Sequence, residues 1–287
     1  MMQSLKDSVR ELQGTKSAIR QAMMSPAGMR VAWVVVEAED DYAVYSKFMN
    51  PDTTVVKTSE GNEGRRGYAN VEIIVKEIRE EVPQAHIIGI RDADYSKYEE
   101  DFSVTDNVFL TDRRDLEMML LESVSVRQAL IDWMSGFEEK LQTCFPICRH
   151  FGYLRIYNDV LDLSVRFHDN LSTSQFWDYS TQSLVTDWRE RCTERFVALA
   201  NGQCTTASFE AFITSKSLSE EGGYDICRGH DLLRLLSLTM IDVQTYSVPH
   251  IMAKMTTAYG LGDFKNTILY ENIRLWQESD GVVALVA

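Results

Sequence analysis

The chain has 287 residues, enough to bury a substantial hydrophobic core, and one domain with a sizeable extension is the simplest expectation for this length. Hydrophobic residues make up 45% of it and aromatic residues 10%, a composition that excludes a disordered protein. The formal net charge of −14 argues against strong, autonomous binding to a polyanion, because nucleic-acid-binding domains usually carry a basic stripe.

Two features indicate the cellular compartment. No apolar stretch approaches the roughly 20 residues needed to span a bilayer, and residues 1–29 carry alternating charges without the hydrophobic core of a signal peptide. The five cysteines are scattered and odd in number, which is typical of free thiols in a reducing compartment. We therefore expect a cytoplasmic protein that makes no membrane contact.

The first third of the chain alternates strand and helix signals. Residues 3–25 predict an amphipathic helix, and a continuous, mainly β-branched run at 31–36 then indicates a strand buried on both faces of a parallel sheet. The elements expected next are a helix at 40–49, a strand at 53–58, a glycine-rich loop at 59–67, a helix at 69–81, strands at 86–90 and 107–111, and a helix beginning within 112–121. This order predicts a compact α/β sheet that ends near residue 122.

Strand signals become rare beyond that point. Helical periodicity is found at 124–142, 158–166, 183–200, 206–214, 230–242 and 246–258, and the pattern at 267–277 is mixed. The expected fold class is therefore α/β, with a parallel sheet core followed by a mainly helical C-terminal domain. The predicted domains are an N-terminal helix at 1–28, the sheet core at 29–122 and the helical domain at 123–287.

Acidic side chains follow two of the predicted strands at their carboxyl ends. Glu37 comes directly after the first strand with Asp41 four residues later, and Asp92 and Asp94 follow the strand at 86–90. Parallel sheets bind ligands beyond this edge, and carboxylates gathered there repel one another unless a cation neutralises them. Mg²⁺ prefers oxygen ligands and is often shared with a phosphate, so the pattern points to phosphoryl-transfer chemistry.

Two smaller patterns have competing interpretations. Arg65 and Arg66 lie in the glycine-rich loop, where they could bind a substrate phosphate or simply form a solvated pair. Cys144 and Cys148, with His150 nearby, have part of the spacing of a zinc site. Because no second pair of ligands lies at a suitable distance, we interpret the cysteines as core residues.

The acidic pattern resembles that of a TOPRIM domain. In this family a strand is followed by Glu-x₃-Asp and a later strand by Asp-x-Asp, which here correspond to Glu37 with Asp41 and Asp92 with Asp94. The order of the predicted strands between the two motifs also fits. The resemblance covers residues 30–122 and implies a TOPRIM-like fold for the sheet core.

Two later segments extend the resemblance to OLD-like TOPRIM nucleases of bacteria. Thr111 to Glu117 is similar to the block that follows the Asp-x-Asp strand in those proteins, where a further carboxylate serves the metal site. Gly229 to Leu233 resembles a Gly-His-Asp motif of one subgroup, which joins a TOPRIM core to a helical C-terminal region. That subgroup includes the effector subunit of the PARIS anti-phage system, whose partner is an ABC-type ATPase.

The Gly-His-Asp segment also has a purely structural interpretation. Asp231 precedes an apolar helical run and is a natural N-cap, and Gly229 is a natural turn residue. His230 would then pack or form hydrogen bonds, although its chemistry also suits a substrate-binding or catalytic role. The sequence leaves both interpretations open.

The chain departs from the family pattern at two places. Glycine usually follows the first glutamate, where this chain has Ala38, a residue that cannot adopt positive φ as cheaply. No lysine stands out as the catalytic lysine of OLD-type nucleases, and Lys97, Arg65 and Arg66 are no more than candidates. These departures support an alternative in which the chain is a non-catalytic, TOPRIM-like regulatory or partner-binding subunit.

The resemblance implies a metal-dependent nuclease that hydrolyses phosphodiester bonds. One or two Mg²⁺ ions, for which Mn²⁺ can substitute, would be held by Glu37, Asp41, Asp92, Asp94 and Glu117. Of these, the catalytic residues would be Glu37, Asp92, Asp94 and Glu117, and the substrate-binding candidates are Arg65, Arg66 and His230.

The likeness to the PARIS effector implies a particular biology. The chain would be a toxin of an abortive-infection system that cuts RNA, tRNA in particular, once infection releases it from its ATPase partner, and a homodimer after release is a further expectation. Likeness to OLD nucleases at large would instead imply a DNA substrate. Weak intrinsic affinity for polyanions suits a toxin that a partner restrains.

Overall fold

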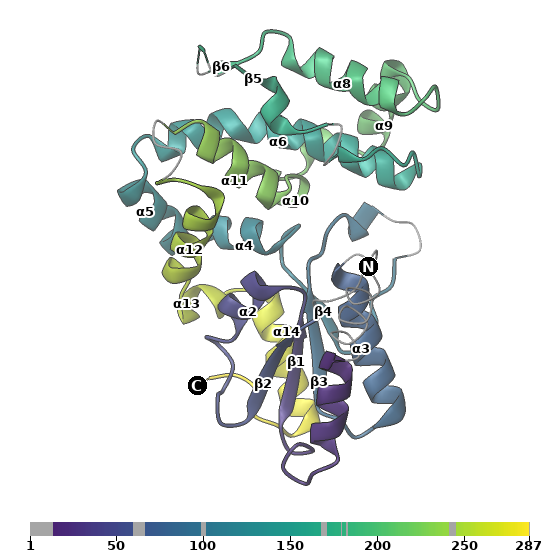
Figure 1. Ribbon diagram of the computed structural model, residues 1–287, viewed down its shortest axis with the longest axis vertical. Helices are drawn as coiled ribbons and strands as arrows, with labels where there is room; N and C mark the ends of the chain where they lie inside the picture. Colours follow the sequence, from purple (N-terminus) through teal and green to yellow (C-terminus); the bar gives the residue numbers. More distant parts are fainter. Residues whose placement is uncertain are drawn as a thin grey trace, which may run out of the picture. The chain divides into compact units, whose positions relative to one another are not determined.

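The computed structural model describes residues 14–59, 67–98, 102–167, 171–178, 180–181, 183–240 and 245–286 (Figure 1). Its contacts divide the chain into two compact units. The first, here called the sheet unit, comprises residues 1–93, 102–112 and 259–287, and the second, the helical unit, comprises 94–101 and 113–258. This division differs from the predicted boundary after residue 122, because the C-terminal segment belongs with the sheet.

The sheet unit is built on four parallel strands in the order β2-β1-β3-β4. The strands are β1 at Ala32–Val36, β2 at Thr54–Thr58, β3 at Ile87–Arg91 and β4 at Val108–Leu110. Every residue of β1 and β3 is buried, as their continuous apolar runs predict for central parallel strands. The prediction of four strands in an α/β arrangement is confirmed, with bounds that agree to within one residue.

Helices cover the sheet within the same unit. Residues 14–23 are helical, and the named helices are α2 at Glu39–Tyr45, α3 at Gly67–Glu81, α13 at Leu261–Phe264 and α14 at Ile268–Asp280. Helix 14–23 and α3 bury Ile19 and Ile74 against Trp33 and Val35, which are alternate residues on one face of β1. The mixed pattern at 267–277 is therefore a helix, and the helix predicted at 40–49 ends earlier, at Tyr45.

The C-terminal segment completes the sheet unit through main-chain bonds. Leu285 forms an antiparallel bridge with Met49, and the Asn50 amide donates to the Ala284 carbonyl at 2.8 Å. The Thr54 hydroxyl donates to the same carbonyl at 3.0 Å. Phe264 of α13 stacks on Phe48 with ring centroids 4.7 Å apart. Residues more than 200 positions apart in sequence thus share one core.

The helical unit contains all the remaining described elements. They are η1 at Ser96–Tyr98, α4 at Leu116–Glu122, α5 at Val124–Trp133, α6 at Phe137–Val160, η2 at Thr173–Phe176, β5 at Trp177–Asp178, β6 at Ser183–Leu184, α8 at Trp188–Leu199, α9 at Thr206–Ser215, η3 at Leu218–Glu220, α10 at Gly223–Ile226, α11 at Gly229–Leu238 and α12 at Val248–Ala258. The mainly helical second half agrees with the prediction, whereas the short antiparallel pair of β5 and β6 was not expected.

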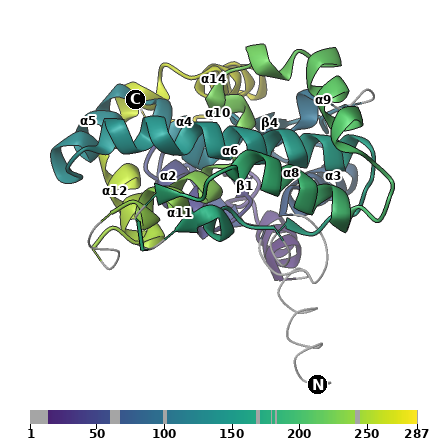
Figure 2. The same cartoon turned by 90° about the horizontal axis from the view of Figure 1, so that it is seen from above.

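Helix α6 is the central element of the helical unit and is longer than its sequence predicts. It extends through Pro146 for 24 residues, so the stretch between the predicted segments 124–142 and 158–166 is helical throughout. The expected single helix at 124–142 is instead divided before Gly136, which caps α6 with φ 70°. Helices α8, α9, α10 and α11 all contact α6, and Figure 2 shows α6 running through the middle of this group.

Crossing a bilayer demands a long and continuously apolar helix. None of the helices in the described ranges meets that requirement.

Candidate functional site

Two predicted site residues meet at the carboxyl edge of the sheet. Glu37 directly follows β1 and Asp92 directly follows β3, and these two strands are hydrogen-bonded neighbours. The backbone amide of Asp92 donates to Glu37 Oε1 at 2.9 Å. The Ser59 hydroxyl donates to the Glu37 carbonyl at 3.1 Å and so holds the turn after β1. The parallel register of the two strands therefore brings the two acidic positions together.

Asp41 is positioned by the first turn of α2. Its Oδ2 accepts a hydrogen bond from the Ala38 amide at 3.0 Å. Ala38 is the N-cap of α2, with φ −142° and ψ 178°, an extended conformation that any residue adopts. The backbone at this position therefore does not require glycine, which removes the structural objection raised by the alanine.

A buried tyrosine of the sheet unit is affected by the charges of nearby carboxylates. Tyr45 of α2 is fully buried, and its hydroxyl has no hydrogen-bond partner among the residues that the structure describes. Burial raises the pKa of Tyr45 well above 10, and the negative charges of Asp41, Asp92 and Asp112 raise it further. These three carboxylates are therefore near enough to Tyr45 for their charges to act on its phenol.

Sequence reasoning missed both Tyr45 and Asp112 as members of this group. Signals for them were present: Tyr45 lies four residues after Asp41 and so on the same helical face, and Asp112 follows the strand β4 much as Glu37 follows β1. Asp112 also has a structural task. Its two carboxylate oxygens accept from the amides of Ile268 at 2.6 Å and Leu269 at 2.8 Å at the start of α14.

The donor set of the sheet unit has the right chemistry for a hard cation, since Glu37, Asp41 and Asp92 all offer carboxylate oxygens. In the described parts of the chain, however, no three His, Cys, Asp or Glu side chains are arranged to hold one metal ion. One oxygen each of Glu37 and Asp41 accepts from a backbone amide, which uses only part of a carboxylate's capacity. Metal binding here accordingly stays a prediction.

The remaining predicted ligands, Asp94 and Glu117, belong to the helical unit. Asp94 adopts φ 47°, and its amide donates to the Arg114 carbonyl at 2.7 Å. The Arg114 guanidinium, which lies 4.4 Å from the Tyr95 ring centroid, reaches Asp94 Oδ1 at 3.2 Å and also pairs with Asp115. The guanidinium thus fixes Asp94 in its turn.

Helices α4 and α11 approach each other closely at Gly229. Asp115 caps α4 by accepting from the Met118 amide at 3.1 Å, and its other oxygen accepts from the Gly229 amide at 2.9 Å. A Cβ atom on Gly229 would lie 2.4 Å from Glu117 Cβ and 2.6 Å from Asp115 Oδ1. The glycine of the Gly-His-Asp segment is therefore required by contact with the Asp115–Glu117 block.

Asp231 of the Gly-His-Asp segment does not have the N-cap role that the sequence suggests for it. The N-cap of α11 is Arg228 and not Asp231, because the helix already begins at Gly229. Asp231 instead forms a 2.7 Å ion pair with Arg155 of α6. His230 is exposed, and partial burial together with the charge of Arg228 lowers its pKa. Its predicted role in substrate binding is not tested by this geometry.

The remaining residues that the sequence singled out lie in different parts of the chain. Arg65 and Arg66 lie outside the described residues. Lys97 pairs with Glu221 at 2.7 Å on the surface of the helical unit. Cys144 and Cys148 are buried on α6, where burial raises the pKa of both thiols and so keeps them protonated.

Comparison with known proteins adds no family assignment. The chain matches no protein-family model, and no curated protein matches it. The fold itself defines a class, namely an α/β protein with a four-stranded parallel sheet in one unit and a mainly helical second unit.

Proposed function

We propose that this chain is a Mg²⁺-dependent, TOPRIM-type nuclease that hydrolyses phosphodiester bonds. The observation that carries the proposal is the pair of Glu37 and Asp92 at the carboxyl edge of neighbouring parallel strands, joined by a 2.9 Å hydrogen bond. Open parallel sheets bind ligands at this edge, and carboxylates are the preferred ligands of Mg²⁺. The order of strands and acidic motifs along the chain supports the same assignment.

Each residue has a stated role in this proposal. Glu37, Asp41 and Asp92 would hold an ion in the sheet unit, whereas the expected metal-binding role of Asp94 and Glu117 rests on the resemblance alone. A bound ion would polarise the phosphate and lower the pKa of a bound water. The Asp92 amide orients the Glu37 carboxylate, and Arg114 holds Asp94 in its turn, so both acids are positioned by the protein.

The resemblance to the PARIS effector supports a cellular role. The chain would be the toxic effector of an anti-phage system, cutting RNA, and tRNA in particular, after release from an ABC-type ATPase. A net charge of −14 weakens association with any nucleic acid, which favours a nuclease that is restrained by a partner over one that acts continuously. Cleavage of DNA remains the outcome that the wider OLD family would lead us to expect.

A second candidate is a non-catalytic subunit that keeps the fold without turnover. The observation in its favour is that Glu37 and Asp41 both accept bonds from backbone amides and that no metal-binding trio exists among the described side chains. Calorimetric titration with Mg²⁺ and Mn²⁺ separates the two candidates. A nuclease site binds the ion with loss of affinity in Glu37→Gln, whereas a structural carboxylate edge binds none.

The decisive experiment compares three purified variants. Glu37→Gln and Asp92→Asn are expected to reduce Mg²⁺-dependent cleavage of a tRNA pool by roughly 100-fold or more, because each removes a carboxylate ligand of the ion that would stabilise the negatively charged transition state. Asp40→Asn is the matched control, since Asp40 is an exposed acid on the same first turn of α2 as Asp41. Wild-type cleavage by Glu37→Gln or Asp92→Asn would exclude this active site.

The same variants give a cellular readout. Expression of the chain with a triggered ATPase partner should arrest growth and degrade tRNA, and Glu37→Gln should be harmless while Asp40→Asn stays toxic. If Glu37→Gln and the unmodified chain are equally toxic, the regulatory-subunit candidate is favoured.

A further inference from the structure

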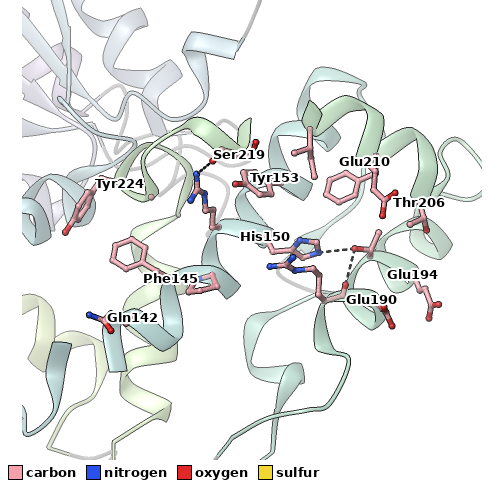
Figure 3. A pocket seen from close by; sticks show the side chains of 17 residues that line it. Gln142, Phe145, His150, Tyr153, Glu190, Glu194, Thr206, Glu210, Ser219 and Tyr224 are labelled. Atoms are coloured by element: carbon pink, nitrogen blue, oxygen red, sulfur yellow. Dashed lines mark hydrogen bonds between the residues drawn. The ribbon is translucent and has the colours of Figure 1, made fainter. Parts of the chain in front are cut away.

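The helical unit contains a cavity of about 970 Å³ that the proposed nuclease site does not use (Figure 3). One wall is a single face of α6, where Gln142, Phe145, Arg149 and Tyr153 recur at helical spacing. Helices α8 and α9 form the opposite wall, and η3 and α10 contribute the rest. Its volume is at the upper end of the range of small-molecule sites in proteins.

The two ends of the cavity differ in chemistry. Phe145 and Tyr224 occupy one end, with their rings edge to face and their centroids 5.4 Å apart. Glu190 and Glu194 of α8 and Glu210 of α9 line the other end, as Figure 3 shows. Glu190 and Glu194 are four residues apart on one helix, where like charges destabilise each other unless a cation lies between or beside them.

A neutral histidine lies between the two ends. His150 is only 6% exposed, and its Nε2 is 3.0 Å from the Thr193 hydroxyl. That hydroxyl donates its single proton to the Arg189 carbonyl at 3.1 Å, so it must accept from His150. His150 therefore carries its proton on Nε2, and its Nδ1 is a hydrogen-bond acceptor.

Negatively charged groups outnumber positively charged groups around the cavity. Three carboxylates and two guanidinium groups line it, and one of the guanidinium groups, that of Arg149, already donates to the carbonyls of Ser219 at 2.6 Å and of Glu221. The glutamates at the acidic end would repel a phosphate or carboxylate ligand and so weaken its binding. A ligand that carries several N–H donors and a positive charge would satisfy it.

We propose that this cavity binds a small organic cation with an apolar body. Its protonated amine or guanidinium would lie between the glutamates of α8 and α9, and its ring or chain would pack against Phe145 and Tyr153 at the aromatic side. Arg149 holds the η3 backbone against α6 and so maintains the wall that the apolar body contacts. The same chemistry is offered by a free amine and by a basic side chain next to an aromatic residue in a peptide.

Calorimetry with three probes tests the proposal on the full chain. Tryptamine represents the free amine, a capped tryptophan–lysine dipeptide represents the peptide source, and indole-3-propionate has the same ring with the opposite charge. We expect a cationic probe to bind and indole-3-propionate to bind at least about tenfold more weakly, because a charge-assisted hydrogen bond is lost and repulsion replaces it. The tighter of the two cations identifies the source.

Substitutions locate the binding. Glu194→Gln and Glu210→Gln should each raise the Kd of the cationic probe by about tenfold. Both residues are exposed, so the variants should fold, as their melting temperatures will show. Glu139→Gln is the control, because Glu139 is an exposed acid on α6 outside the cavity. Equal binding of the anionic probe, no binding of either cation, or unchanged binding in both Gln variants would overturn the proposal. None of these readouts depends on nuclease activity.

Discussion

Only a hydrogen atom fits on the Cα of Gly229, where α11 starts against the Asp115–Glu117 block. Gly229→Ala should therefore lower the free energy of unfolding by about 1–3 kcal/mol, as overpacking of a close contact usually does. Gly262→Ala is the matched control: this glycine lies in α13, and a methyl group added there would have nothing within 4 Å, so alanine should be neutral or up to about 1 kcal/mol stabilising. Urea denaturation measures both. Equal stability of the two variants would contradict the described packing.

His150 is a second residue whose surroundings set its behaviour. Burial, with a smaller effect from the charge of Arg189, lowers its pKa from 6.5 to about 4, so the folded protein binds this proton less readily than the unfolded chain does. Its contribution to stability is therefore complete above pH 6.5 and is lost as the pH falls from 6.5 to 4. The size of the loss is on the order of 3 kcal/mol.

A substitution isolates that contribution. His150→Gln keeps an N–H that can reach Thr193 but cannot be protonated, so its unfolding free energy should fall less between pH 6.5 and 4 than that of the unmodified chain. His250→Gln, at an exposed position in α12, should follow the unmodified curve. Parallel curves for His150→Gln and the unmodified chain would show that the imidazole is not kept neutral by burial.

At the scale of elements, α14 depends on a residue far from it in sequence. Asp112 follows β4 and accepts from two of the first amides of α14, and Thr267 accepts from a third, that of Tyr270. Asp112→Ala should cost about 0.5–2 kcal/mol, because the amides at the helix start lose their acceptors. Hydrogen exchange should accelerate at Ile268 and Leu269 in this variant, whereas Asp106→Ala, at an exposed turn before β4, should leave their exchange unchanged.

At the scale of the whole molecule, segments from the early and the late part of the chain belong to the same sheet unit. Residues 259–286 supply Phe264 to the core beside Phe48 and the bridge from Leu285 to Met49. A fragment limited to residues 29–122 lacks these contacts and also lacks helix 14–23, which buries Ile19 against the sheet. It should expose apolar surface that the complete unit covers.

Truncation tests that dependence. A chain that ends at residue 258 should lose the near-ultraviolet circular dichroism of the sheet unit and be cut by protease within β2 and α2, because Thr54 of β2 and Tyr45 of α2 contact the missing segment. The 287-residue chain in which Val283, an exposed residue of that segment, is replaced by Ser serves as the control. A protease-resistant sheet unit in the truncated chain would show that the segment is dispensable.

Local signals in the sequence were sufficient to predict the strands of the sheet. The runs at 31–36 and 86–90 are continuous and apolar because both faces of a central parallel strand are buried, and this is readable without any partner. The acids that follow them, Glu37 and Asp92, could be placed at the same edge for the same reason. The long helix α6 was missed in its middle, because Pro146 disfavours a helix locally and only packing in the helical unit compensates for it.

Contacts between distant segments were decided only by the tertiary structure. Nothing near Asp112 in sequence indicates that it caps α14, nothing near Gly229 indicates Glu117 as its neighbour, and nothing in α6 alone indicates a cavity shared with α8 and α9. The alternation of apolar and polar residues reports how each segment is buried, but not which other segment buries it. The sequence by itself therefore determined the strands and the acidic edge of this protein, while its close contacts, its caps and its cavity depend on pairings across the chain that only folding establishes.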